Sequence, residues 1–131
     1  MDTTDPAYSQ AIAFFDGKPR AFGLFESLAE LLRGEYPATE VQVKKTQISF
    51  VDRHIYACAS MMRAKRKSEL PDEYVVVTFS APESICSERV AQQVMIRPGR
   101  WTVHIVVGDP SELDDELLGW VDVSHALATG R

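Results

Sequence analysis

From residue 41 to residue 107 the apolar residues of the chain recur at every second position, in short runs separated by polar or turn-forming residues. This spacing is typical of β-strands, whose side chains alternate between the two faces of a sheet. Parallel strands must be joined by crossovers of a dozen or more residues, which are usually helical, and only residues 80–96 leave room for one. The pattern therefore predicts a mainly antiparallel sheet of four to five strands. The clearest strands are predicted at residues 54–62, 74–80 and 101–107.

Two stretches of this strand region are ambiguous. In KKTQ, residues 44–47, the alternation changes phase, which indicates either a β-bulge or two separate short strands. Residues 80–96 fit one or two helical turns or a strand, and we favour a turn over residues 82–88 followed by a strand that ends at Arg97. Pro98 and Gly99 then predict a tight turn, because Pro presets the φ of one turn position and Gly accepts the left-handed position after it.

A helical pattern precedes the strands. After Pro19, a favoured first residue of a helix, apolar residues recur at steps of three and four until Gly34, which we expect to end the helix. Upstream of it, Asp5 is placed to cap a helix that begins with Pro6, so the first residues form a short helix or an ordered arm.

A second helical pattern, residues 111–128, follows the strands, and Ser111 with Asp114 resembles a capping box at its start. The order of elements predicts an α+β fold, with N-terminal and C-terminal helices packed on one face of the antiparallel sheet. The length of 131 residues fits one domain, residues 1–131. Within it, residues 1–16 are the arm or short helix and residues 17–128 the core domain.

No segment approaches the roughly 20 apolar residues that cross a bilayer, and the first ten residues have no secretory pattern, so we expect a cytoplasmic protein. Cys58 and Cys86 lack metal-ligand spacing and are interpreted as free thiols. The four acids between Glu112 and Glu116 suit the start of a helix, where its dipole favours negative charge. We therefore expect no metal site and no cofactor.

Charge is unevenly distributed along the chain. Residues 44–100 carry ten Lys or Arg and six acids, a balance of +4, whereas the remaining residues carry four bases and thirteen acids, a balance of −9. The net charge of −5 argues against a general nucleic-acid-binding domain. The basic run at residues 63–67 is interpreted as a solubilising loop tip, with phosphate contact as the alternative.

The face of the sheet that the helices leave uncovered is the natural place for a ligand. Polar residues that alternate with the core pattern should lie there, and five of them are candidates for binding an anion: Lys45, Gln47, Arg89, Arg100 and His104. Arginine offers a bidentate donor to carboxylate or phosphate and lysine a point charge, so several converging side chains would form an anion pocket. Each residue taken alone also has a purely structural explanation. Lys44 and Lys45 point to opposite faces of a regular strand, so at most one reaches such a site.

The leading hypothesis is a non-catalytic binding module for a small anionic ligand or an acidic group of a partner. The common hydrolase, nucleotidase, zinc-protease and dinucleotide-binding motifs are missing, so we assign no catalytic residue. One alternative is a small enzyme with His104 as general base. Another is an interaction or homodimerisation domain with an exposed apolar patch at Trp101, Tyr56 or the Met61–Met62 pair.

Several blocks of the sequence, KTQISF and PGRWTVH most clearly, resemble an uncharacterised bacterial family of small proteins, the DUF5655-like family, which carries a "predicted transport protein" label. The resemblance covers residues 14–128. It implies an α+β fold akin to YdhG-like domains and no established activity. The positions that match the family pattern are Lys45, Thr46, Phe50, Arg89, Arg100, Trp101, His104 and Asp114. The family pattern has a histidine pair near the end, and Val103 replaces the first of the two.

Overall fold

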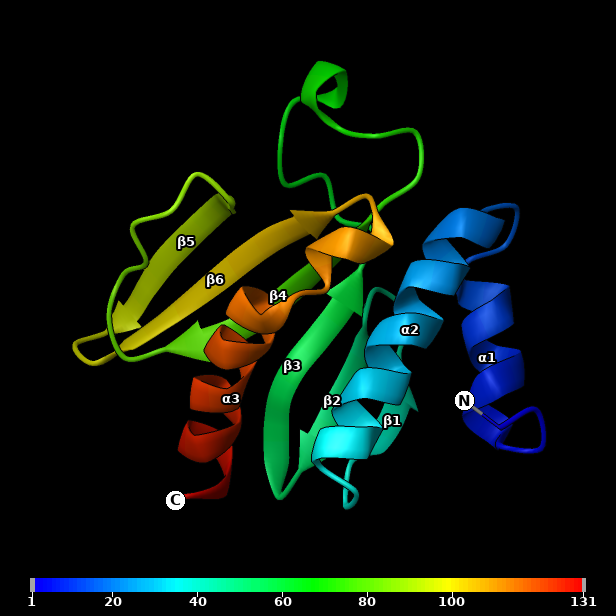
Figure 1. The fold of residues 1–131 in the computed structure, drawn as a ribbon, viewed down its shortest axis with the longest axis horizontal. Helices are drawn as coiled ribbons and strands as arrows, with labels where there is room; N and C mark the ends of the chain where they lie inside the picture. Colours follow the sequence, from blue (N-terminus) through cyan, green and yellow to red (C-terminus); the bar gives the residue numbers. More distant parts are fainter. Residues whose placement is uncertain (1, 131) are drawn as a thin grey trace.

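The computed structural model describes residues 2–130, which form a six-stranded sheet with three α-helices. All neighbouring strands are antiparallel, in the order β1-β2-β3-β4-β6-β5. The strands are β1 (Glu40–Val43), β2 (Ile48–Asp52), β3 (His54–Ser60), β4 (Val75–Ala81), β5 (Val90–Arg97) and β6 (Arg100–Val107). The α+β class and the antiparallel sheet are confirmed. The last hairpin, β5–β6, joins the sheet through the pairing of β6 with β4, which leaves β5 at the edge of the sheet (Figure 1).

The sheet has one strand more than the four to five predicted. Residues 44–47 are a hairpin turn, in which the Lys44 N–H donates to the Gln47 carbonyl at 2.9 Å and Val43 pairs with Ile48. The change of phase there marks a reversal of the chain. Of the two alternatives, the predicted bulge at residues 44–47 is therefore wrong, and the prediction of two short strands is confirmed. A shift of register does occur nearby, between Phe50 and Val51 in the β2–β3 pair.

The three α-helices lie on one side of the sheet, in front of it in Figure 1. They are α1 (Pro6–Phe14), α2 (Pro19–Glu35) and α3 (Asp115–Thr129), and two 3-10 turns are η1 (Lys67–Glu69) and η2 (Pro110–Glu112). The Asp5 carboxylate accepts from the Ala7 N–H at 2.9 Å, so the predicted cap of α1 is confirmed. Within residues 2–130 no helix is both long and apolar enough to span a bilayer.

Two predicted helix boundaries were wrong. Gly34 does not end α2; it lies in the last turn, and Tyr36 is the C-cap residue. Ser111 lies in η2, and α3 begins four residues later because Asp114 is its N-cap, accepting from the Leu117 N–H at 3.1 Å.

The alternation predicted for residues 101–107 is confirmed. Val103, Ile105 and Val107 are fully buried against the helices, whereas Thr102, His104 and Val106 are on the opposite face and only partly buried. On the helix side, Phe25 of α2 stacks on Phe50 of β2 with ring centroids 6.0 Å apart. The hydrophobic core therefore lies between the helices and one face of the sheet, and the other face has no helix on it.

Residues 61–74, here called the strap, connect β3 to β4 and pack closely against the end of β6. A Cβ added to Gly108 would lie 2.6 Å from Cγ of Pro71 in the strap. We expect Gly108→Ala to lower the free energy of unfolding by about 1–3 kcal/mol, because the strap must move to admit the methyl group. Urea unfolding measures this. Gly23→Ala, where the added Cβ meets nothing within 4 Å, is the control, and equal stability of the two variants would contradict the close packing.

Candidate functional site

A row of polar residues crosses the whole sheet on the face without helices. Successive strand pairs place Gln42 opposite Ser49, Ser49 opposite Cys58, Cys58 opposite Thr78, Thr78 opposite His104 and Gln92 opposite His104. Side chains directly opposite each other point to the same face and lie about 5 Å apart. Each strand contributes one member, so the row, here called the polar row, exists only because the six strands pair in this register.

Hydrogen bonds connect parts of the polar row. The Thr78 hydroxyl and Nδ1 of His104 are 2.7 Å apart, and Nε2 of Gln47 donates to the Ser49 hydroxyl at 3.2 Å. Burial holds the pKa of His104 below its ordinary value of 6.5, so the imidazole is neutral at pH 7. At that pH His104 offers a hydrogen bond rather than a charge.

The Thr78–His104 pair has the spacing of a nucleophile and its general base. In a catalytic triad a third group orients the imidazole, whereas within residues 2–130 the side-chain hydrogen bond of His104 joins it to Thr78. The nearest thiol, Cys58, is buried, and this burial raises its pKa despite the opposing effect of Ser49 and Lys44. A buried thiol with a raised pKa is a poor nucleophile.

The strap carries the basic run of the sequence alongside the polar row. Nε2 of Gln92, a member of the row, donates to the Ala64 carbonyl at 2.9 Å, and Ala64 is buried. The Tyr74 hydroxyl joins the two ends of the strap by donating to the carbonyls of Met61 and Met62 at 3.1 and 3.2 Å. A cavity of about 270 Å³ within the strap is lined by Arg63, Lys67, Leu70, Pro71, Asp72 and Tyr74.

Of the five predicted anion-binding residues, Gln47 and His104 make hydrogen bonds in the polar row, whereas Lys45 is exposed in the β1–β2 turn. Ser49 and His104 are separated by three strand spacings, about 14 Å. Arg100 is four residues from His104 along β6, about 13 Å away and in the opposite direction from the β1–β2 turn. The structure therefore does not gather these residues into one small pocket.

Arg89, the fifth residue, lies on the helix side of the sheet. Its guanidinium pairs with Asp114 at 2.9 Å and Glu116 at 3.0 Å, and donates to the Glu112 carbonyl at 2.7 Å. It also lies over the Trp120 ring, 5.8 Å from the ring centroid. These contacts fix the 82–89 loop to the start of α3, so Arg89 has a structural explanation. Asp114 and Glu116 are likewise held by Arg89, and Asp114 also caps α3. Within residues 2–130 no group of three acidic, His or Cys side chains could hold a metal ion.

The predicted exposed apolar patch is found only in part. Tyr56 is in the core and Trp101 is partly buried, whereas Met62 is 37% exposed. The most exposed large apolar side chains are Val94, Met95 and Ile96, on the edge strand β5.

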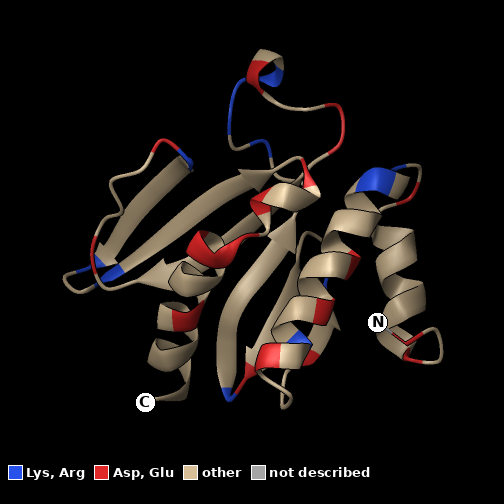
Figure 2. Cartoon of the chain, viewed as in Figure 1, with Lys and Arg blue, Asp and Glu red and all other residues tan. Residues whose placement is uncertain are grey.

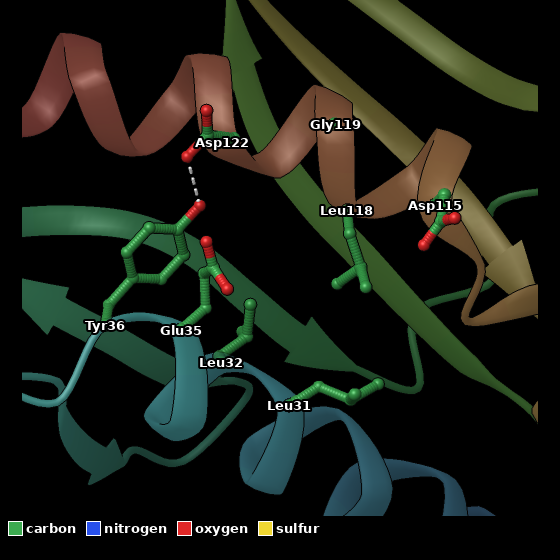
Figure 3. Close-up of a pocket in the computed structure, with 8 residues that line it drawn as sticks. All are labelled: Leu31, Leu32, Glu35, Tyr36, Asp115, Leu118, Gly119 and Asp122. Carbon is green, nitrogen blue, oxygen red and sulfur yellow. Dashed lines mark hydrogen bonds between the residues drawn. The ribbon is translucent and has the colours of Figure 1, made fainter.

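Between α2 and α3, on the opposite side of the molecule from the polar row, lies a groove that the sequence did not reveal (Figure 3). The Tyr36 hydroxyl donates to the Asp122 carboxylate at 2.5 Å across one end of this groove. Burial, with Asp122 as a further cause, holds the pKa of Tyr36 well above its usual value, so the hydroxyl keeps its proton. The positions that meet here are 86 residues apart in sequence, and no local pattern connects them.

A family model described as "Domain of unknown function (DUF5655)" matches residues 12–128. The chain belongs to this family. No curated protein and no solved structure matches the chain. The DUF5655 match confirms the resemblance carried by the KTQISF and PGRWTVH blocks. It assigns no activity to the domain.

Proposed function

We propose that this DUF5655 domain is a non-catalytic binding module whose open sheet face and strap bind an anionic group of a ligand or partner. The observation that carries the proposal is the hydrogen bond from Gln92 to the Ala64 carbonyl, because it holds the basic strap beside the polar row. Arg63 and Lys65 directly flank the anchored Ala64. The site is thus different from the five-residue pocket expected from the sequence: His104 stays in it and the strap supplies the cations.

The distribution of charge supports this assignment. Figure 2 shows acidic residues along α2 and α3, and basic residues on the first part of the strap and at the β5–β6 turn, with acidic residues in the second part of the strap. Four of the five strap residues from Arg63 to Lys67 are basic. An anion that approaches the strap therefore meets positive charge while the acidic helices lie on the other side of the sheet. Charge-assisted hydrogen bonds from such cations are about twice as strong as neutral ones.

The test is a titration with sulfate, which stays doubly charged throughout the relevant pH range, followed by ¹⁵N–¹H NMR. We expect shifts at Ala64, Gln92 and His104, and about tenfold weaker binding in the variant Arg63→Gln/Lys65→Gln/Lys67→Gln, which corresponds to about 1.4 kcal/mol. The control Lys18→Gln/Arg53→Gln/Arg97→Gln removes the same charge at other sites. Equal weakening by both triple variants would show that only the net charge matters, and would contradict the proposal.

Sulfate binding should also strengthen at low pH. An anion favours the imidazolium form of His104, whose pKa in the free protein lies below 6.5. The affinity is then expected to rise as the pH falls through the pKa of His104 in the complex, which the anion raises above that of the free protein, and to level off below the free-protein pKa. His104→Gln keeps a hydrogen-bonding side chain but cannot be protonated, so its affinity should lack this rise. A wild-type affinity that depends on pH no more than that of His104→Gln, down to the lowest pH at which both proteins stay folded, would exclude a charged contact between His104 and the anion.

A further inference from the structure

The groove between α2 and α3 has an apolar floor that the fold leaves unfilled. Two adjoining cavities of about 320 and 520 Å³ lie in it, and Leu31 and Glu35 line both. Leu31 is 40% exposed although it lies between two helices. In Figure 3, Leu31 of α2 and Leu118 of α3 extend into the same space. The leucines that line the groove are Leu31, Leu32, Leu113 and Leu118.

Two glycines in this groove have no explanation in the fold. Gly34 lies in the last turn of α2 and Gly119 inside α3, where glycine is less favourable than alanine. Neither has a positive φ, and a Cβ added to either would meet nothing within 4 Å. Each glycine lines one of the two cavities. A missing side chain at these positions keeps the groove wide and lets another backbone approach both helices closely.

The rim of the groove is acidic. Among the residues that line the two cavities, four are acidic and none is Lys, Arg or His: Glu30, Glu35, Asp115 and Asp122. Charge of one sign around an apolar floor favours a partner with apolar residues in the centre and the opposite charge on both sides. The same acidic rim would repel an anionic membrane surface.

We propose that the α2–α3 groove binds a basic amphipathic helix of a partner protein. The shape supports a helix: the lining runs along α2 from Ser27 to Tyr36, about 14 Å at 1.5 Å per residue. Helices that lie in grooves present an apolar stripe of residues at positions i, i+3, i+4 and i+7. Here that stripe contacts the leucines, Gly34 and Gly119 allow close approach, and Lys or Arg on either side of the stripe pairs with the rim. This site is separate from the anion site on the open sheet face, and each can fail without the other.

The probe is an acetylated and amidated 18-residue peptide of Leu, Ala and Lys, with Leu on one helical face and Lys beside it. Binding is measured by calorimetry and by ¹⁵N–¹H NMR, in which glycine amides are well separated. We expect saturable shifts at Gly34 and Gly119. A peptide with Glu in place of Lys should not bind. A scrambled peptide of the same composition, without the apolar stripe, should bind at least ten times more weakly. Equal affinity of the scrambled peptide would overturn the proposal in favour of nonspecific attraction between charges.

Variants of the protein test the groove directly. Gly34→Gln/Gly119→Gln should keep or raise the melting temperature, because glutamine favours a helix more than glycine does and the added Cβ meets open space. The same change should weaken peptide binding at least tenfold. Gly23→Gln, in α2 but lining neither cavity, is the matched control and should leave the affinity unchanged. Wild-type affinity in the double variant would overturn the proposal.

The acidic rim is tested by a second pair of variants. Glu35→Gln/Asp115→Asn should weaken binding of the Lys peptide several-fold, whereas Glu83→Gln/Glu88→Gln removes the same charge outside the groove and should have little effect. Asp122 is left unchanged because it accepts the Tyr36 hydrogen bond. An equal effect of both pairs would contradict a role for the rim.

Discussion

Ser124→Ala is expected to lower the free energy of unfolding by about 2–4 kcal/mol, because it leaves one buried donor and one buried acceptor without a partner. The Ser124 hydroxyl donates to the Tyr56 carbonyl at 2.6 Å and accepts from the Ser80 N–H at 3.0 Å. Ser124 is 1% exposed, so water cannot replace these bonds. The effect is expected to exceed those of most single-residue changes because one oxygen atom joins α3 to two strands.

The strand pairing explains why this serine is needed. The β2–β3 pair shifts register between Phe50 and Val51, where Tyr56 has no opposite residue. The β3–β4 pairing begins at Ala57 opposite Phe79, so Tyr56 and Ser80 lie just beyond that ladder. The Tyr56 carbonyl and the Ser80 N–H therefore have no partner in the β3–β4 ladder, and both form hydrogen bonds with the Ser124 hydroxyl of α3. A short polar side chain on α3 thus completes the hydrogen bonding of the sheet.

Urea unfolding of Ser124→Ala gives the measurement, and Ser9→Ala, at an exposed position of α1, is the matched control. We expect the control to change the free energy of unfolding by less than about 0.5 kcal/mol, as is usual for surface substitutions. A loss in Ser124→Ala no larger than in Ser9→Ala would mean that the two backbone groups find other partners.

The elements of the fold that follow from local sequence were predicted well. The alternation in residues 101–107, the Pro98-Gly99 turn and the Asp5 cap each depend on neighbouring residues, and each is found in the structure, with Gly99 at φ 81°. Gly34 shows the limit of this reasoning. A glycine near the end of a helical pattern usually marks the helix end, but the same residue inside the helix has to be explained by its surroundings in space.

The candidate sites depend on contacts that are distant in sequence, and these could not be predicted. His104 was correctly placed opposite the core face, but its neighbour Thr78 is 26 residues away and is set by the pairing of β4 with β6. Gln47 is also in contact with the polar row, three strand spacings from His104. Residue types and alternation predict which face a side chain is on. The distance between two such side chains is set by strand order, which a single sequence does not encode locally.

The partners of Arg89 are also distant in sequence, and replacing this arginine is expected to have the second large effect on stability. We expect Arg89→Met to lower the free energy of unfolding by about 2 kcal/mol, mainly through the lost hydrogen bond to the partly buried Glu112 carbonyl, because partly exposed ion pairs contribute little. Methionine keeps most of the contact with Trp120, so the variant separates hydrogen bonding from packing. Arg97→Met, at the exposed end of β5, is the control and should be close to neutral.

The loss should also depend on pH in a defined direction. The hydrogen bond from Arg89, followed by that from the Leu117 N–H, holds the pKa of Asp114 below its usual value of 3.8. A carboxyl whose pKa is lower in the folded than in the unfolded state stabilises the fold above the unfolded pKa, and this contribution is lost as the pH falls through the folded pKa. In Arg89→Met the pKa of Asp114 should rise towards 3.8, so stability should fall less steeply below pH 4. An NMR titration of the Asp114 carboxyl in both proteins measures the shift. An unchanged pKa in the variant would show that the helix cap alone lowers it, and that Arg89 stabilises the start of α3 through its other contacts, with Glu116, the Glu112 carbonyl and Trp120.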